Sequence, residues 1–120
     1  MRCNMNFIDN EYLIPIFIGC SAANRRGASR IMKKTGIRAH FFAPHFFPFD
    51  ALSYKCHKVF PFREELISDR IVSFVNSIEE YYCPIILMCD DFARQVVMRN
   101  SVPLESACVA MEIEEFFENS

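Results

Sequence analysis

LIPIFIGCSAANRRG, residues 13–27, is the stretch that decides the fold. It begins with a continuous apolar run that is too short for a helix and is typical of a buried parallel strand. Gly19 ends this run, and a short loop of small residues then leads into a basic segment with helical spacing. A strand, a tight loop and a helix in this order begin a βαβ unit, and ligands bind beside such loops in doubly wound domains.

The composition indicates one ordinary globular domain. The chain has 120 residues, of which 52% are apolar and 23% are charged. We expect residues 1–12 to be an N-terminal lead-in and residues 13–120 to form a single domain. The net charge of −2 argues against a nucleic-acid partner. No apolar run reaches the roughly 18 residues of a membrane span, and no signal-peptide core precedes the first acidic residues, so we expect a cytoplasmic protein without a membrane partner.

The six cysteines include no C-x-x-C pair. Their spacing favours small core residues in a reduced chain, with a disulfide or a metal site as the alternative. We therefore expect no metal ligands among them.

Apolar periodicity predicts alternating strands and helices along the rest of the chain. Pro15 cannot donate to a strand ladder, so we expect pairing of the first strand to begin at Ile16. The alternation predicts a three-layer α/β fold, with helices on both faces of a mostly parallel four-stranded sheet of order 3-2-1-4. Strands are expected at residues 13–18, 37–43, 58–62 and 84–89, and helices at residues 24–35, 63–82, 91–99 and 103–117.

This strand order predicts a ligand crevice between the first and fourth strands, where the chain changes direction across the sheet. The loop after the first strand would then face the acidic pair after the fourth. Backbone N–H groups at a helix N-terminus, together with serine, asparagine and arginine side chains, can hold a phosphate or carboxylate. The ligand-binding candidates are Gly19, Cys20, Ser21, Asn24, Arg25, Asp90 and Asp91.

The spacing of these residues matches no complete catalytic or nucleotide motif. The loop has neither the G-x-G-x-x-G fingerprint nor a P-loop. The spacing favours a tight strand-to-helix turn over an anion site, and it favours a helix N-cap role for one aspartate of the pair. Cys20 lies at a helix N-terminus, where a thiolate pKa can fall, but no histidine is near it in sequence. We therefore predict no catalytic residue and no metal site.

Phe46, Phe47 and Phe49 lie between two prolines, which exclude a regular element there. They either fold back onto the core or form an apolar docking patch. We keep them as interface candidates.

The chain resembles the N-terminal, pre-ATP-grasp domain of the ATP-grasp ligases, the superfamily of biotin carboxylase, carbamoyl-phosphate synthetase and many amino-acid ligases. The similar segments are IPIFIG at residues 14–19, GASRIMKKTGIR at 27–38, SYK at 53–55 and IILMCDD at 85–91. Each segment alone is a loose match. Their order and spacing carry the resemblance over residues 13–117.

The resemblance implies a non-catalytic, Rossmann-like domain that supports the substrate side of the cleft in an ATP-dependent carboxylate ligase. Gly19–Ser21 and Asp90–Asp91 would be its contributions to that cleft. ATP and Mg²⁺ would be held by ATP-grasp lobes that this chain lacks, so the implied partner is the missing ATP-grasp region or a partner subunit, and no cofactor is expected on this chain. The alternatives are a free-standing nucleotide- or small-anion-binding module, and a protein-interaction subunit that forms a homo-oligomer.

Overall fold

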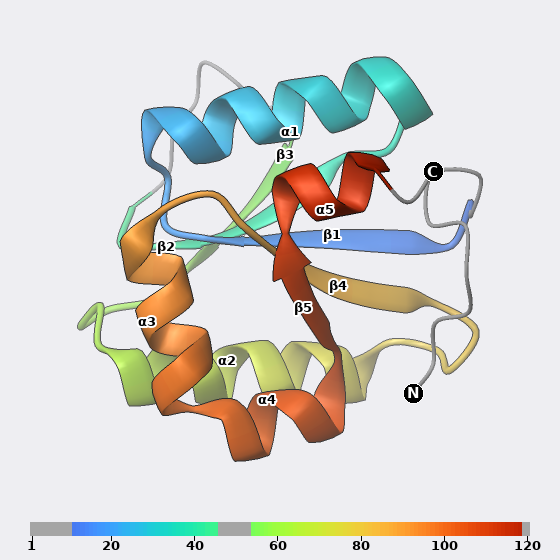
Figure 1. Cartoon of the computed structure of the whole chain (residues 1–120). Helices are drawn as coiled ribbons and strands as arrows, with labels where there is room; N and C mark the ends of the chain where they lie inside the picture. Colours follow the sequence, from blue (N-terminus) through green and yellow to red (C-terminus); the bar gives the residue numbers. More distant parts are fainter. Residues whose placement is uncertain (1–10, 46–53, 119–120) are drawn as a thin grey trace.

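The computed structural model describes residues 11–45 and 54–118 (Figure 1). Its centre is a five-stranded sheet in which every neighbouring pair is parallel and the order is β3-β2-β1-β4-β5. The predicted α/β class and the order 3-2-1-4 are therefore confirmed, and the number of strands is corrected from four to five. The strands are β1 (Leu13–Ile18), β2 (Ala39–Ala43), β3 (Tyr54–Lys58), β4 (Cys83–Met88) and β5 (Val109–Glu112).

Helices cover both faces of this sheet and give a three-layer, Rossmann-like arrangement (Figure 1). One face packs under α1 and α5, and the other packs against α2, α3 and α4. Each layer has its own apolar cluster, because alternate residues of the strands point to opposite faces. The helices are α1 (Ala22–Thr35), α2 (Glu64–Ser77), α3 (Asp91–Arg99), α4 (Ser101–Ala107) and α5 (Ile113–Glu118).

β1 lies at the centre of the sheet and supplies both apolar clusters. Ile16 and Ile18 belong to the cluster with α2, and Phe17 belongs to the cluster with α1. Pairing with β2 begins at Ile16, as expected, but pairing with β4 already begins at Leu13. Pro15 is therefore not paired with a residue of β2, but it lies opposite Ile85 in the pairing with β4.

The third strand and the second helix differ from the prediction. The prediction of a strand at residues 58–62 is wrong, because β3 spans Tyr54–Lys58 and pairs with β2 from Tyr54 onwards. Tyr54 is buried in the sheet, whereas Phe60 is 74% exposed beyond its end. The helix predicted to reach residue 82 ends at Ser77, because Ile78 has extended backbone angles.

The helix predicted at residues 103–117 is also wrong, because a strand interrupts it. Val109–Glu112 forms β5 and pairs with β4, from Ile85 opposite Val109 to Met88 opposite Glu112. The edge of β4 supplies backbone partners that a local helical preference cannot outweigh. The segment is thus divided into α4, β5 and α5.

Four cysteines have free, half-buried thiols that pack against the apolar clusters: Cys20, Cys56, Cys89 and Cys108. Cys83 is buried in β4 and is disulfide-bonded, so the expectation of a wholly reduced chain is wrong at this residue. Phe46, Phe47, Phe49 and most of the expected lead-in lie outside the described residues.

Gly27 marks the place where α1 comes closest to the junction of β5 and α5. A Cβ atom there would lie 2.6 Å from Ile113 Cδ1, 3.0 Å from Phe17 Cε1 and 3.2 Å from Cys89 Sγ. Ile113 can turn its terminal methyl away, but the Phe17 ring is fully buried. A side chain at position 27 therefore has little room.

We predict that Gly27→Ala lowers the free energy of unfolding by about 1 kcal/mol, because overpacking outweighs the gain of alanine over glycine in a helix. Urea denaturation measures the change. Ser29→Ala, in the same helix, is the control and should change stability by less than about 0.5 kcal/mol. A Gly27→Ala variant as stable as this control would contradict the close approach.

Candidate functional site

Two helix N-termini meet at the carboxyl edge of the sheet. β1 and β4 are neighbours, but α1 follows β1 on one face while α3 follows β4 on the other (Figure 1). This is the change of direction expected between the first and fourth strands. It is the position at which open α/β sheets bind ligands.

Ser21 and Asp90 are the N-cap residues of α1 and α3, and they are hydrogen-bonded to each other. Ser21 Oγ accepts from the Asn24 N–H at 3.1 Å, and Asp90 Oδ1 accepts from the Ala93 N–H at 2.9 Å. Ser21 Oγ also donates to Asp90 Oδ2 at 2.8 Å. The structure therefore brings together the two loops that the sequence places opposite each other.

Asn24 holds the turn between β1 and α1 from inside. Its Nδ2 donates to the Ile18 carbonyl at 2.9 Å and to the Gly19 carbonyl at 2.8 Å. Its side chain is fully buried, and its Oδ1 atom has no hydrogen-bond partner in the described residues. Gly19 has a φ of 85°, a left-handed conformation that favours glycine. The amide donors of Asn24 thus fix this turn and are not left for a ligand.

The remaining predicted residues occupy two environments. Cys20 packs against the apolar cluster under α1, and burial raises the pKa of its thiol although Arg25 acts in the opposite direction. Arg25 is exposed beside it. Asp91 is exposed and forms an ion pair with Arg94 at 2.9 Å. Asp90 is therefore the cap of the acidic pair, and Asp91 is the solvated member.

A pocket of about 420 Å³ lies beside this junction, between the N-terminal half of α1 and the ends of β4 and β5. Its wall includes Gly27 and Cys89. Burial raises the pKa of the Cys89 thiol to about 12, so this group is neutral near pH 7. The charged lining consists of Arg26, Arg30, Arg94, Glu112 and Glu114.

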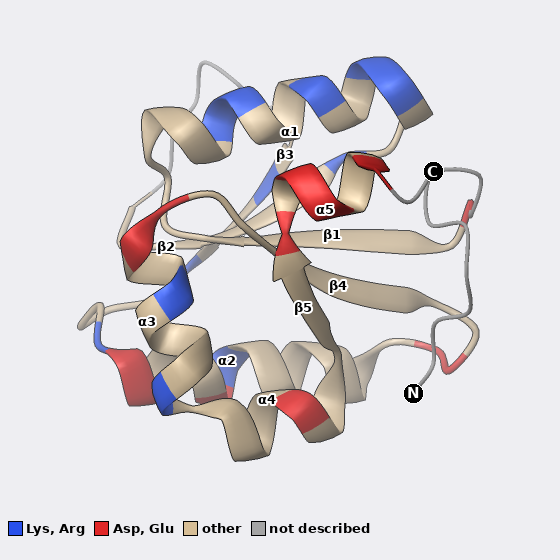
Figure 2. Ribbon diagram, in the orientation of Figure 1, with Lys and Arg blue, Asp and Glu red and all other residues tan. Residues whose placement is uncertain are grey.

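Ion pairs neutralise two of the three arginines in this pocket. Arg94 makes a two-pronged contact with Glu112, with N–O distances of 2.7 to 3.0 Å, which lowers the pKa of the Glu112 carboxyl. Arg30 pairs with Glu114 at 2.7 Å, so the basic outer side of α1 meets the acidic α5 (Figure 2). Arg26 has no ion pair or side-chain hydrogen bond within the described part of the chain. Arg26 is therefore the arginine of this pocket that makes no ion pair with a described residue.

The charged residues of this pocket are not among the site residues that the sequence predicts. The sequence pattern predicts a continuous helix for Glu112 and Glu114, whereas the structure has a strand that carries Glu112 to the carboxyl edge of the sheet. A usable pattern exists, because Val109–Glu112 is a short apolar run that ends in an acid, as β4 ends before Asp90. From the sequence, the basic side of α1, with Arg26 and Arg30, is expected to be a solvated face, with a polyanion site as the alternative.

Aromatic side chains flank the other side of the junction. The rings of Phe62 and Phe92 stack with centroids 5.3 Å apart. A Cβ atom added at Gly19 would lie 3.9 Å from Cζ of Phe62. Phe92 is 37% exposed and Phe60 is 74% exposed. We call Phe60, Phe62 and Phe92 the aromatic edge.

Two of the histidines form a pair of their own. His40 Nδ1 and His57 Nε2 are 2.9 Å apart, on the adjacent strands β2 and β3. Both rings pack against Phe74 of α2. Burial, followed by the neighbouring His57, lowers the pKa of His40 to about 4, and burial also lowers that of His57. A proton on either ring would place a charge in this apolar contact.

Comparisons with models of protein families, with curated proteins and with solved structures found no match. Within residues 11–45 and 54–118, no group of three or more His, Cys, Asp or Glu side chains could hold a metal ion. None of the helices in the same residues has the length and apolar character needed to cross a bilayer. The fold and the geometry of the site therefore carry the functional argument.

The coupling free energy between the Ser21 and Asp90 side chains can be measured with a double-mutant cycle. Ser21→Ala and Asp90→Ala should each cost about 1 kcal/mol of unfolding free energy, because each removes an N-cap. The double variant should cost about 0.5–1 kcal/mol less than their sum, because the shared hydrogen bond is lost only once. Strict additivity in urea denaturation would show that the two caps are energetically independent.

We predict that the His40–His57 pair makes the protein less stable in acid. Because the folded-state pKa of His40 lies below the ordinary value of 6.5, the unfolded chain binds the proton first. Stability should be full above pH 6.5 and fall, on the order of 1 kcal/mol, as the pH decreases towards 4. Lys55 and Arg38 lie near His40 and act in the same direction.

His40→Gln should flatten this part of the stability profile, measured by urea denaturation between pH 8 and pH 4. An unchanged slope in that variant would assign the acid sensitivity to other groups.

Proposed function

We propose that this chain is a non-catalytic, Rossmann-like domain that supports the carboxylate-substrate side of the cleft in an ATP-dependent carboxylate ligase. It would act either within a longer chain or beside a partner subunit. The resemblance of residues 14–19, 27–38, 53–55 and 85–91 suggests this role. The observation that carries it is the unpaired Arg26 in a pocket at the carboxyl edge of the sheet.

The pocket has the charge and position that a small carboxylate requires. A guanidinium offers a planar set of donors that matches a carboxylate, and Arg26 makes no ion pair with a described acid. Arg26 also lies near the N-terminal end of α1, where the helix dipole favours an anion. Because Glu112 and Glu114 offset the other two arginines, the pocket suits one negative charge rather than a polyphosphate.

The aromatic edge supports a second part of this proposal. Phe92 leaves apolar surface exposed next to the Ser21–Asp90 junction, and Phe60 is exposed beyond the end of β3. ATP-grasp lobes that cover this edge would bury those rings and close the crevice. ATP and Mg²⁺ would then be bound by the lobes, and this chain alone would not hydrolyse ATP.

A free-standing module for a nucleotide or small anion is the second candidate. The same pocket favours it, because Arg26 offers an unpaired cation for a small anion. A protein-interaction subunit is the third, and the exposed Phe60 favours it. The three candidates differ in which ligand stabilises the isolated chain and in its mass at high concentration.

We predict that a small carboxylate, and not ATP or NAD, stabilises the isolated protein. Acetate, succinate and glutamate are the carboxylates to compare at constant ionic strength. A ligand at ten times its Kd adds about 1.4 kcal/mol, or about 5 °C in Tm. Arg26→Gln should abolish this shift, whereas Lys34→Gln, farther along α1, should retain it.

The opposing outcomes separate the candidates. Stabilisation by ATP or NAD would favour the free-standing module. A mass that rises with concentration in sedimentation, and falls again in Phe60→Ser, would favour the interaction subunit. No shift with any carboxylate would remove the support that Arg26 gives to the ligase role.

A further inference from the structure

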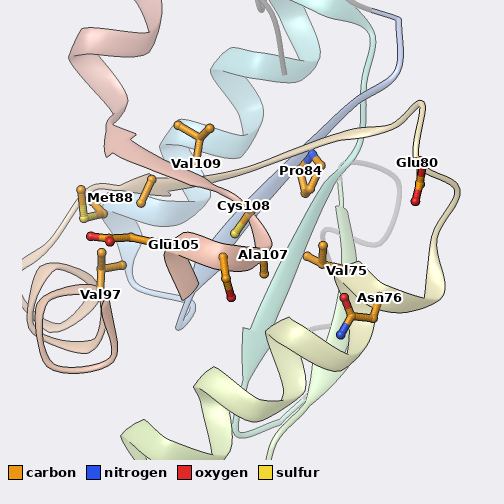
Figure 3. Close-up of a pocket in the computed structure, with 12 residues that line it drawn as sticks. Val75, Asn76, Glu80, Pro84, Met88, Val97, Glu105, Ala107, Cys108 and Val109 are labelled. Atoms are coloured by element: carbon orange, nitrogen blue, oxygen red, sulfur yellow. The ribbon is translucent and has the colours of Figure 1, made fainter. Parts of the chain in front are cut away.

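We call the pocket of about 420 Å³ that Arg26, Arg30 and Arg94 line the arginine pocket. A second cavity, of about 680 Å³ (Figure 3), lies on the opposite face of the sheet. Its floor is formed by β4 and β5, with Pro84, Met88 and Ala110. Its sides come from Val75 of α2 and from Cys108 at the end of α4. We call this cavity the acidic cleft, because Glu80 and Glu105 are the charged residues in its described lining.

The charged groups of the acidic cleft all have one sign. Glu80 and Glu105 line it, and no Lys, Arg or His side chain is among the described residues that do. Both glutamates are exposed, and neither has an ion pair or side-chain hydrogen bond with a described residue. In Figure 3 they lie on opposite sides of a group of apolar side chains. The cleft therefore combines an apolar centre with two uncompensated negative charges.

Small side chains explain why this space is open. Ala107, Cys108 and Ala110 line the cleft where larger residues would fill it. Burial raises the pKa of the Cys108 thiol to about 12, so it contributes a neutral wall. α4 contains only seven residues before the chain enters β5, so it covers only part of this face of the sheet.

We propose that the acidic cleft binds a small organic cation, in which an ammonium group is attached to an apolar body. The volume lies within the range of small-molecule sites, about 300–1,000 Å³. The apolar body would cover Val75, Met88 and Ala110, and the ammonium would pair with Glu80 or Glu105. An organic anion of the same shape would meet two carboxylates without a counter-charge.

This inference is independent of the ligase role, because the acidic cleft lies on the other face of the sheet and prefers the opposite charge. If the carboxylate test fails, the proposal of cation binding in the acidic cleft still stands, and the reverse also holds. The arginine pocket and the acidic cleft also share only Met88 among their lining residues.

The test uses n-octylammonium chloride and sodium octanoate as probes that differ in charge but share an apolar chain. Methyl NMR spectra of the protein locate binding through the resonances of Ala107 and Ala110. We expect octylammonium to shift these resonances at millimolar concentration and octanoate to leave them unchanged. Glu80→Gln and Glu105→Gln should each weaken octylammonium binding about threefold, as for a partly exposed ion pair.

Two control variants complete the design. Glu115→Gln removes an exposed acid of α5, outside the cleft, and should bind octylammonium as the original chain does. Ala110→Leu fills the cleft and should abolish binding, with circular dichroism to establish that the variant is folded. Equal binding of octanoate, no shift at Ala107 and Ala110, or an equal loss in Glu115→Gln would overturn the proposal.

Discussion

The burial of β1 between two parallel strands and two helical layers is the constraint on which the rest of the structure depends. Ile16, Phe17 and Ile18 have no exposed surface. Both faces of β1 must therefore be covered, and its two edges must be paired. Because α1 follows it on one face and α3 follows the neighbouring β4 on the other, their N-termini meet at one edge, where Ser21 and Asp90 bond. The position of the candidate site is thus a consequence of how the central strand is buried.

The sequence was sufficient where local pattern and topology agree. The apolar runs of β1 and β4, with the helical period between them, predicted the order 3-2-1-4 and hence the meeting of Ser21 with Asp90. It was insufficient where a partner strand decides the structure. Val109–Glu112 has helical spacing relative to its neighbours, yet the open edge of β4 makes it a strand. The arginine pocket depends on that strand, so its charged residues could not be assembled from sequence spacing.

The two faces of the sheet offer opposite electrostatic environments. Under α1 and α5, Arg30 is paired with Glu114, and Arg26 has no ion pair with a described residue. Under α2 and α4, two glutamates lie beside an apolar surface, and no Lys, Arg or His is among the described residues that line this cleft. A net charge of −2 for the whole chain conceals this separation. The net charge of the whole chain therefore does not predict which ligand charge each surface prefers. That prediction needs the charges of each surface, which are known only once the fold is known.

The junction of β5 with α5 links the two helical layers across the edge of the sheet. Glu112, the last residue of β5, binds Arg94 of α3 on one face, and Glu114, two residues later, binds Arg30 of α1 on the other. Ion pairs at such exposed positions add little to stability. Their effect is on direction, because each carboxylate restricts the orientations open to its arginine. The short segment from Glu112 to Glu114 thereby orients two guanidinium groups that belong to separate helical layers, Arg94 of α3 and Arg30 of α1.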